Sequence, residues 1–215
     1  MRTFCIYCGN KPGITKDHVP PKNLFPKPRP TNMVTVPCCD ECQKKYKKDE
    51  DVFVAWINFG LAGVTKQGKA LWDQKLKRTY KKDLGVKKVI ANSFKQINLV
   101  TPGGIYLGKK LVVSIDQKRL TNVLKKIIRG LFWVEYKVRL PDKIPINIIG
   151  IRKNDSRINE IIPFTQQAST FWENVFEYRH VWLDRGSFES LWALSFYRQN
   201  YFIAIVDEIK DIIQL

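Results

Sequence analysis

The sequence predicts an α+β protein, on the strength of three observations. Two Cys-x-x-Cys pairs bracket a loop-rich, proline-rich segment near the N-terminus. Helical spacing of apolar residues recurs in residues 65–84 and again after Asp116. Strand composition, rich in Ile, Val, Phe, Tyr and Trp, marks three later segments, residues 144–151, 173–183 and 190–206. We therefore expect a small N-terminal module followed by a region in which an antiparallel sheet packs on a helix.

The N-terminal module spans residues 1–58, and the sequence Asn58-Phe59-Gly60 marks its boundary with a second domain, residues 59–215. Four thiolates at the spacing of the two pairs suit one tetrahedral zinc ion, which would supply folding energy that so short a segment lacks. A redox role for the pairs is disfavoured because no βαβ pattern surrounds them. Cys38 could replace Cys39, but the two-residue gap favours the ligand set Cys5, Cys8, Cys39 and Cys42.

Strand, loop, strand and helix follow one another in this module, which is the order of a ββα-metal hairpin. The loop carries the dipeptide Asp17-His18 between the two cysteine pairs. The helix is expected to start at Asp40 as its N-cap, with Gln43 three residues on as in a capping box, and to continue to Trp56.

The second domain is expected to begin with a helix over residues 65–84 that ends at Gly85. Short strands are predicted over residues 86–115, with turns at Pro102-Gly103-Gly104 and at Gly108-Lys109. A further helix begins near Asp116. Its apolar stripe is formed by Leu120, Leu124, Ile127, Leu131 and Val134, and its opposite, basic face by Lys118, Arg119, Asn122, Lys125, Lys126 and Arg129.

The charge of the chain points to a polyanion as partner. Its formal net charge is +17 over 215 residues. Residues 1–150 carry 30 basic and 11 acidic side chains, whereas residues 151–215 carry 7 and 9. Nucleic acid is the favoured polyanion. No run of apolar residues long enough to span a membrane is present, and the N-terminus lacks a signal-peptide core, so we expect a cytoplasmic protein without a membrane partner.

The Asp17-His18 pair suits the hydrolysis of a phosphodiester bond. Histidine is the natural general base near neutral pH. A divalent cation held by oxygen ligands can offset the charge that builds on the phosphate and on the leaving oxygen. Adjacent residues on an extended strand point to opposite faces, so one side chain can hold the metal while the other addresses the water.

These residues resemble the zinc-bearing HNH endonucleases. The similarity covers the two cysteine pairs, the run Thr15–Lys22 (Thr-Lys-Asp-His-Val-Pro-Pro-Lys), the run Asn32–Pro37, and the helix residues Lys48–Asp51 with Phe53. The motif Asp-His-Val-Pro-Pro-Lys is similar to that of one bacterial subgroup of these enzymes. A weaker similarity to the family occurs at Lys126–Phe132. The resemblance implies an N-terminal HNH module, a DNA-cutting activity and, from the subgroup, a part in antiviral defence.

Carried over residue by residue, the resemblance makes His18 the general base and Asp17 a ligand of Mg²⁺ or Mn²⁺. Asn32 matches the residue that orients the base, and Gln43 stands where the family usually has Asn or His to complete the metal site. Gln43 is equally well explained as a capping residue. The nearby lysines are expected to bind the phosphates of the nucleic acid. The alternative is that they only form a solvated surface. They are Lys16, Lys22, Lys44, Lys45, Lys47 and Lys48.

Two other functions stay open at this point. One is a zinc-stabilised nucleic-acid-binding protein without cutting activity, favoured by Gln at position 43. The other is an RNase with the same chemistry. The C-terminal domain is expected to set the substrate or to bind a protein partner, which includes a second copy of the chain.

Overall fold

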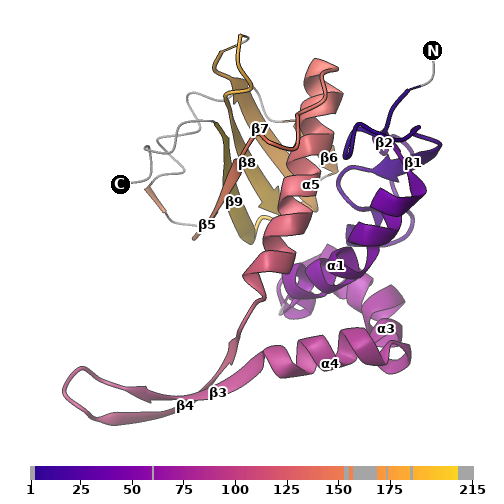
Figure 1. The fold of residues 1–215 in the computed structure, drawn as a ribbon. Coiled ribbons are helices and arrows are strands. Elements are labelled where there is room, and N and C mark those ends of the chain that lie inside the picture. The colour runs from indigo at the N-terminus through magenta and orange to yellow at the C-terminus, as the bar shows by residue number, and fades with distance from the viewer. Residues whose placement is uncertain are drawn as a thin grey trace.

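The computed structural model describes residues 3–59, 61–152, 155–156, 169–172, 174–184 and 186–207. The described chain has an α+β fold with helices, antiparallel sheets and a cluster of four cysteines at its N-terminal end, which confirms the predicted class (Figure 1). Among the helices of the described residues, none is both long and apolar enough to cross a membrane.

The order strand, loop, strand and helix predicted for the N-terminal module is present, but Asp17 and His18 lie at the end of the first strand and not in the loop. Strand β1 (Thr15–His18) pairs antiparallel with β2 (Thr35–Cys38), and a short 3-10 turn, η1 (Lys22–Leu24), lies in the loop between them. Helix α1 (Asp40–Asn58) follows. The predicted cap is wrong by one residue, because Cys39 has the extended backbone of an N-cap and Asp40 is already helical. Asp40 instead places its negative charge in the first turn, where the helix dipole favours it.

The helix predicted over residues 65–84 is confirmed in place but not at its end. After η2 (Leu61–Gly63), it runs as α2 (Lys66–Leu71), a π-helical turn η3 (Trp72–Leu76) and α3 (Lys77–Lys82). The strand predicted from residue 86 is wrong, since α4 (Leu84–Ser93) occupies that stretch. The Asp83 side chain accepts a hydrogen bond from the Val86 N–H at 2.9 Å and so caps a new helix, with Gly85 inside its first turn.

A two-stranded antiparallel hairpin follows, made of β3 (Phe94–Val100) and β4 (Tyr106–Val113). The predicted turn at Pro102-Gly103-Gly104 connects the strands, and Gly104 takes φ +85°, where glycine is favoured. The predicted turn at Gly108 is wrong. Gly108 lies within β4 at φ +119°, opposite Leu99, where the register of the two strands begins to shift.

Helix α5 (Gln117–Tyr136) packs on the C-terminal sheet as predicted, and the Asp116 side chain caps it by accepting from the Arg119 N–H. The sheet has the order β5-β9-β8-β7-β6 and is antiparallel throughout. Its strands are β5 (Ile146–Ile151), β6 (Ser169–Trp172), β7 (Phe176–Trp182), β8 (Ser190–Phe196) and β9 (Asn200–Val206).

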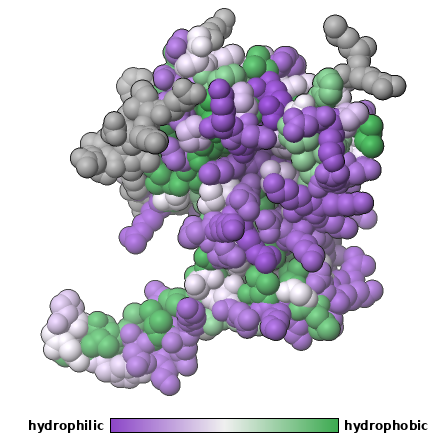
Figure 2. Space-filling view, in the orientation of Figure 1, coloured by the Kyte–Doolittle hydropathy of each residue, from purple (hydrophilic) through white to green (hydrophobic). Residues whose placement is uncertain are grey.

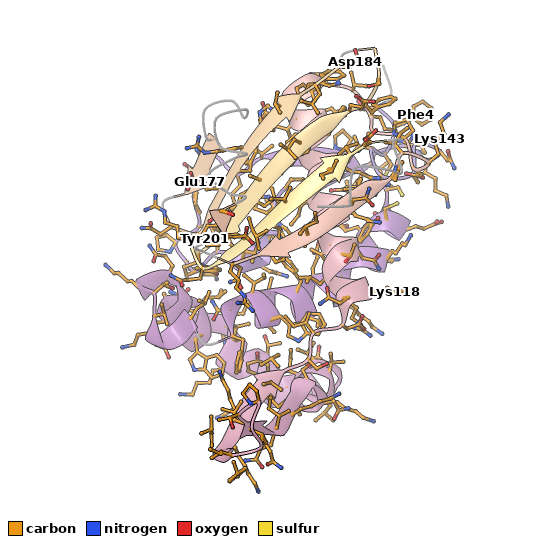
Figure 3. All side chains as sticks on the ribbon, turned by 90° about the vertical axis from the view of Figure 1, so that its left-hand side faces the viewer. Phe4, Lys118, Lys143, Glu177, Asp184 and Tyr201 are labelled. Carbon is orange, nitrogen blue, oxygen red and sulfur yellow. The ribbon has the colours of Figure 1, made fainter. Side chains whose placement is uncertain are left out.

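The segment 190–206 is therefore a hairpin rather than one strand. Its turn uses Tyr197 and Arg198 at φ +54°, a conformation that non-glycine residues rarely adopt and that no Gly or Pro marks in the sequence. Figure 3 looks onto the face of the sheet turned away from α5, where Glu177 and Tyr201 lie in one row across the strands.

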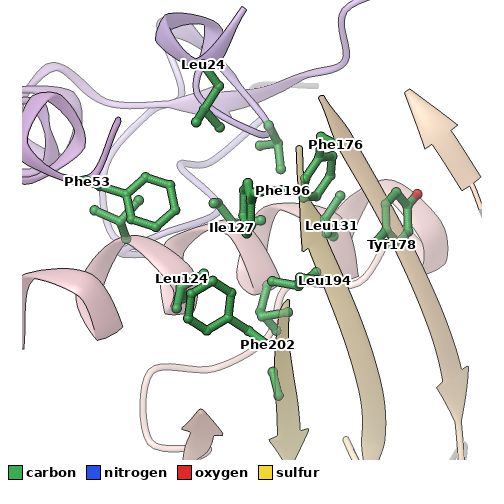
Figure 4. Close-up of a cluster of buried hydrophobic side chains, with 14 of the residues drawn as sticks. Leu24, Phe53, Leu124, Ile127, Leu131, Phe176, Tyr178, Leu194, Phe196 and Phe202 are labelled. Carbon is green, nitrogen blue, oxygen red and sulfur yellow. The ribbon is translucent and has the colours of Figure 1, made fainter. Parts of the chain in front are cut away.

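One continuous apolar core joins the N-terminal module to α5 and the sheet (Figure 4). Phe53 of α1 meets Phe196 of β8 edge-on, with ring centroids 5.4 Å apart. The Asn200 side-chain amide donates to the Ile57 carbonyl at 3.1 Å, and the Tyr197 hydroxyl donates to the Leu24 carbonyl. The module and the sheet thus bury apolar surface against each other across the boundary expected at residue 58.

His180 of β7 is buried between the sheet and α5. Its Nδ1 lies 2.7 Å from the Tyr136 hydroxyl and its Nε2 lies 3.4 Å from a Glu135 carboxylate oxygen. The imidazole also stacks on the Trp192 ring, with centroids 4.9 Å apart. These contacts give His180 a structural role between the sheet and α5, and among the described residues it is not part of the cleft lining at His18.

Candidate metal centre and the cleft at His18

Cys5, Cys8, Cys39 and Cys42 form a cluster in which all four sulfur atoms lie within 4.8 Å of one another. A zinc ion with sulfur ligands at about 2.3 Å in tetrahedral geometry needs sulfurs about 3.8 Å apart. The Sγ atoms of Cys8 and Cys39 are 3.9 Å apart. The cluster is therefore consistent with a structural zinc site, and it contains Cys39 rather than Cys38. Cys38 is buried outside the cluster, where its thiol donates to the Cys39 carbonyl.

Local backbone geometry favours the thiolate form of one cysteine of the cluster, Cys8. Gly9 turns the chain at φ +70° just after the first cysteine pair. Burial favours the neutral thiol of Cys8, but the backbone N–H groups of Asn10 and Lys11 hydrogen-bond its sulfur and lower its pKa to about 7. The Ile6 N–H donates to the Pro37 carbonyl at 3.1 Å, which ties the first cysteine loop to β2. The metal centre and the β1–β2 hairpin are thus one local unit.

The hairpin fixes the Asp17-His18 segment. Asp17 pairs with Val36 and His18 with Thr35 across the two strands, and the Thr15 hydroxyl donates to the Cys38 carbonyl at 2.8 Å. As expected for neighbours on a strand, the two residues differ in exposure: Asp17 is buried and His18 is half-buried.

Asp17 is held by two side chains from distant parts of the chain. The Tyr7 hydroxyl donates to Asp17 Oδ2 at 2.6 Å, and the Lys126 Nζ lies 2.6 Å from the same oxygen. Lys126 also forms an ion pair with Glu50 of α1. Burial opposes the charge on Lys126, but the two carboxylates outweigh it and raise the pKa of the ammonium. Burial in turn raises the pKa of Glu50 despite the nearby ammonium.

Lys126 corrects one sequence prediction. The basic face of α5 was expected to be exposed, yet Lys126 is only 2% exposed. The reason is that α5 is covered on two sides, by the sheet and by the N-terminal module, so its buried surface is wider than one apolar stripe. Charge periodicity gives no sign of this burial.

The same segment of α5 touches the chain just after His18. A Cβ atom placed on Gly130 would lie 2.5 Å from Val19 Cγ2 and 2.9 Å from Val19 Cγ1. Only glycine allows so close an approach. The chain just after His18 and the middle of α5 therefore lie against each other in the fold.

His18 opens onto a cleft of about 470 Å³. Burial and the positive charge of Lys22 lower the pKa of the imidazole, so that it is neutral near pH 7 and able to accept a proton. Asp17 and Glu50 also line the cleft, together with Gln43 from the first turns of α1. The rest of the lining is strongly basic and includes Lys16, Lys22, Lys44 and Lys47.

The structure does not bring every predicted residue into this cleft. Asn32 lies in an exposed turn, and within the described residues it is not part of the cleft lining. Lys45 and Lys48 are exposed on α1 outside the cleft, and the Lys45 Nζ lies 5.7 Å from the centre of the Tyr46 ring. Tyr7, Glu50 and Lys126 are not among the site residues that the sequence predicts.

Over the described residues, the four cysteines are the only group of three or more Cys, His, Asp or Glu side chains close enough to hold a metal ion. A second ion at Asp17 would therefore need other donors, such as an amide oxygen, water or phosphate. Comparison of the chain with protein-family models, with curated proteins and with solved structures finds no match.

Proposed function

We propose that the protein is a metal-dependent endonuclease that hydrolyses phosphodiester bonds in DNA, with His18 as the general base. The observation that carries the proposal is the neutral, half-buried imidazole in a lysine-lined cleft beside a fixed carboxylate. A base with a pKa near or below the working pH, next to cationic side chains that attract phosphate, is what such a hydrolysis needs.

Each residue of the cleft has a role in this proposal. His18 takes the proton from the attacking water. Lys22, Lys44 and Lys47 bind the phosphate backbone and hold it in the cleft. Tyr7 and Lys126 act through Asp17, because their contacts fix its carboxylate in one orientation.

Asp17 and Gln43 are the residues we assign to a Mg²⁺ or Mn²⁺ ion. Both line the cleft, and Tyr7 and Lys126 hold the Asp17 carboxylate in place through its Oδ2 atom, which supports this assignment. Magnesium is commonly held by one or two protein oxygens and completes its shell with water and substrate phosphate, so this small donor set fits it. When bound, the ion would offset the charge that builds on the phosphate.

The test is cleavage of plasmid DNA with magnesium by the wild type, by His18→Ala and by Lys143→Ala. Lys143 is exposed and, among the described residues, is not part of the cleft lining, so it serves as the control. Loss of a general base lowers the rate by roughly 10²–10⁴-fold. We expect that loss in His18→Ala only. Equal cleavage by the wild type and His18→Ala would refute the proposal.

A non-catalytic nucleic-acid-binding protein is the second candidate, and one observation favours it. The Lys126 ammonium already offsets part of the negative charge of Asp17 and Glu50, which leaves less of it to attract a metal ion. Tight, salt-dependent binding of DNA without cleavage would establish this function, and the same assay with RNA tests the RNase alternative. A protein partner of the C-terminal domain and a part in antiviral defence stay predictions from the sequence.

A further inference from the structure

The β3–β4 hairpin, residues 94–113, is a separate feature of the surface that the proposed chemistry does not use. We call it the arm. Its two strands pair only with each other among the described strands, and it projects from the end of α4 away from α5 and the C-terminal sheet (Figure 1). The base is anchored, since the Phe94 ring lies 4.8 Å from the Phe59 ring. Beyond that base, Figure 2 shows the arm standing clear of the body of the protein.

The outer part of the arm exposes apolar side chains. Ile105, Tyr106 and Leu107 are 66%, 56% and 64% exposed. A two-stranded hairpin is only marginally stable in water by itself, and contiguous exposed apolar residues are characteristic of a binding surface. The arm thus has the properties of an element that is covered by a partner.

The charge of the arm decides which partner fits. Residues 84–115 contain five lysines and no acidic residue. Three of the lysines, Lys95, Lys109 and Lys110, lie on the arm itself. Pairing of two arms from two copies of the chain would bring these like charges together, which disfavours a dimer through this element. A polyanion is attracted by the same charges.

The register of the strands distributes the lysines over both faces of the arm. Lys95 pairs with Val112 and Lys110 with Ile97, so that Lys95 and Lys110 share one face, while Lys109 points to the other. Strands of seven and eight residues extend for about 25 Å at about 3.4 Å per residue. The major groove of B-DNA is about 12 Å wide and admits a two-stranded ribbon.

We propose that the arm binds double-stranded DNA by lying in a groove of the duplex. Its lysines reach the phosphates of the groove walls, and the apolar tip contacts the base edges. This inference rests on the proposed function for the nature of the substrate and adds the form of DNA and the element that holds it. Because the lysines meet phosphates, the contribution of the arm is independent of base sequence and sensitive to salt.

The experiment measures binding without cleavage, in the full chain carrying His18→Ala. One variant replaces Lys95, Lys109 and Lys110 by Gln. A second replaces residues 96–111 by Asn-Gly, which joins the opposed residues Lys95 and Val112 by a two-residue turn. The control replaces Lys137, Lys143 and Arg198 by Gln, which removes the same charge from exposed positions outside the arm. The probe is a duplex of about 30 base pairs, titrated between about 50 and 200 mM NaCl.

We expect the lysine variant to reduce the steepness of log K against log salt by about 3 and to weaken duplex binding at least about tenfold. The deletion of the arm should weaken binding at least as much as the lysine variant does. The control should keep the wild-type slope to within about 1. The proposal would be overturned if both arm variants bound the duplex as tightly as the wild type. It would also be overturned if the control lost as much affinity as the arm variants, because the effect would then come from net charge alone. A change from dimer to monomer in the arm variants with unchanged DNA binding would assign the arm to a second copy.

The result of this binding experiment is independent of whether the protein is a nuclease. Cleavage assays on His18→Ala decide whether the cleft is catalytic, whereas the binding assay uses only that variant as a common background. Failure of the arm variants to weaken binding would leave the cleavage result untouched.

Discussion

Replacing Lys126 by methionine should destabilise the protein by about 3–5 kcal/mol, the usual cost of removing one partner from a buried ion pair. Methionine keeps most of the length of the side chain and removes the charge. The Lys126 Nζ lies 2.6 Å from Asp17 Oδ2, a separation that corresponds to a gross attraction of about 6 kcal/mol at an effective dielectric constant near 20. Desolvation of the ions offsets part of it. The variant, however, leaves Asp17 and Glu50 as buried carboxylates without their common cation.

The assay is urea unfolding of the wild type and the variant, followed by circular dichroism, together with thermal melting. For a chain of 215 residues, each kcal/mol shifts Tm by about 2–4 °C, so Lys126→Met should melt about 6–20 °C lower. Adding Asp17→Asn and Glu50→Gln to Lys126→Met removes the stranded charges and should recover much of the loss. Lys118→Met, at an exposed position of the same helix, should stay within about 0.5 kcal/mol of the wild type.

Two results would refute this reasoning. One is a loss below about 1 kcal/mol in Lys126→Met, which would mean that the ammonium is solvated and its pairs are worth no more than surface ones. The other is a triple variant no more stable than Lys126→Met, which would show that the loss comes from altered packing of α5 and not from uncompensated charge.

Three further predictions follow from the same contacts. Purified protein should carry one zinc ion per chain, and removal of the metal by a chelator or by Cys42→Ser should expose residues 1–43 to proteolysis; full protection of the metal-free protein would contradict a structural role. Gly130→Ala should lose about 1–3 kcal/mol because its Cβ meets Val19 at 2.5 Å, whereas Gly63→Ala, exposed in η2 with open space around its Cβ position, should stay close to the wild type; equal effects in urea unfolding would disprove the close approach. The hydrogen bond with His180 lowers the pKa of Glu135 against the effect of burial, and the bond from Tyr178 adds to it. The folded-state pKa lies below the ordinary 4.5, so the carboxylate stabilises the fold above that pH and ceases to do so as the pH falls through its folded value. Glu135→Gln should therefore be less stable than the wild type at pH 7, with the difference shrinking in acid, and a difference that is independent of pH would argue against this assignment.

Structural features that depend on residues close together in the chain could be predicted from the sequence. The two Cys-x-x-Cys pairs predict the cluster because their spacing fixes which sulfurs can meet. Asp116 marks the start of α5 because a carboxylate at that place caps a helix, and the strand composition of the C-terminal segments gives an antiparallel sheet. The same local logic misread residues 86–93, where Val86 and Ile90 suit either a strand or one face of a helix. The Asp83 cap decides for the helix.

By itself, then, the sequence determined the α+β class and the cysteine cluster, since each follows from short-range spacing. Only the tertiary structure decided what surrounds Asp17. Tyr7 and Lys126 are 10 and 109 residues away from it in the chain, and they meet it because α5 is covered on two sides. Burial of this kind arises from how elements pack together, which a pattern of charges along one helix does not contain. Packing also decided that, among the described strands, β3 and β4 pair only with each other.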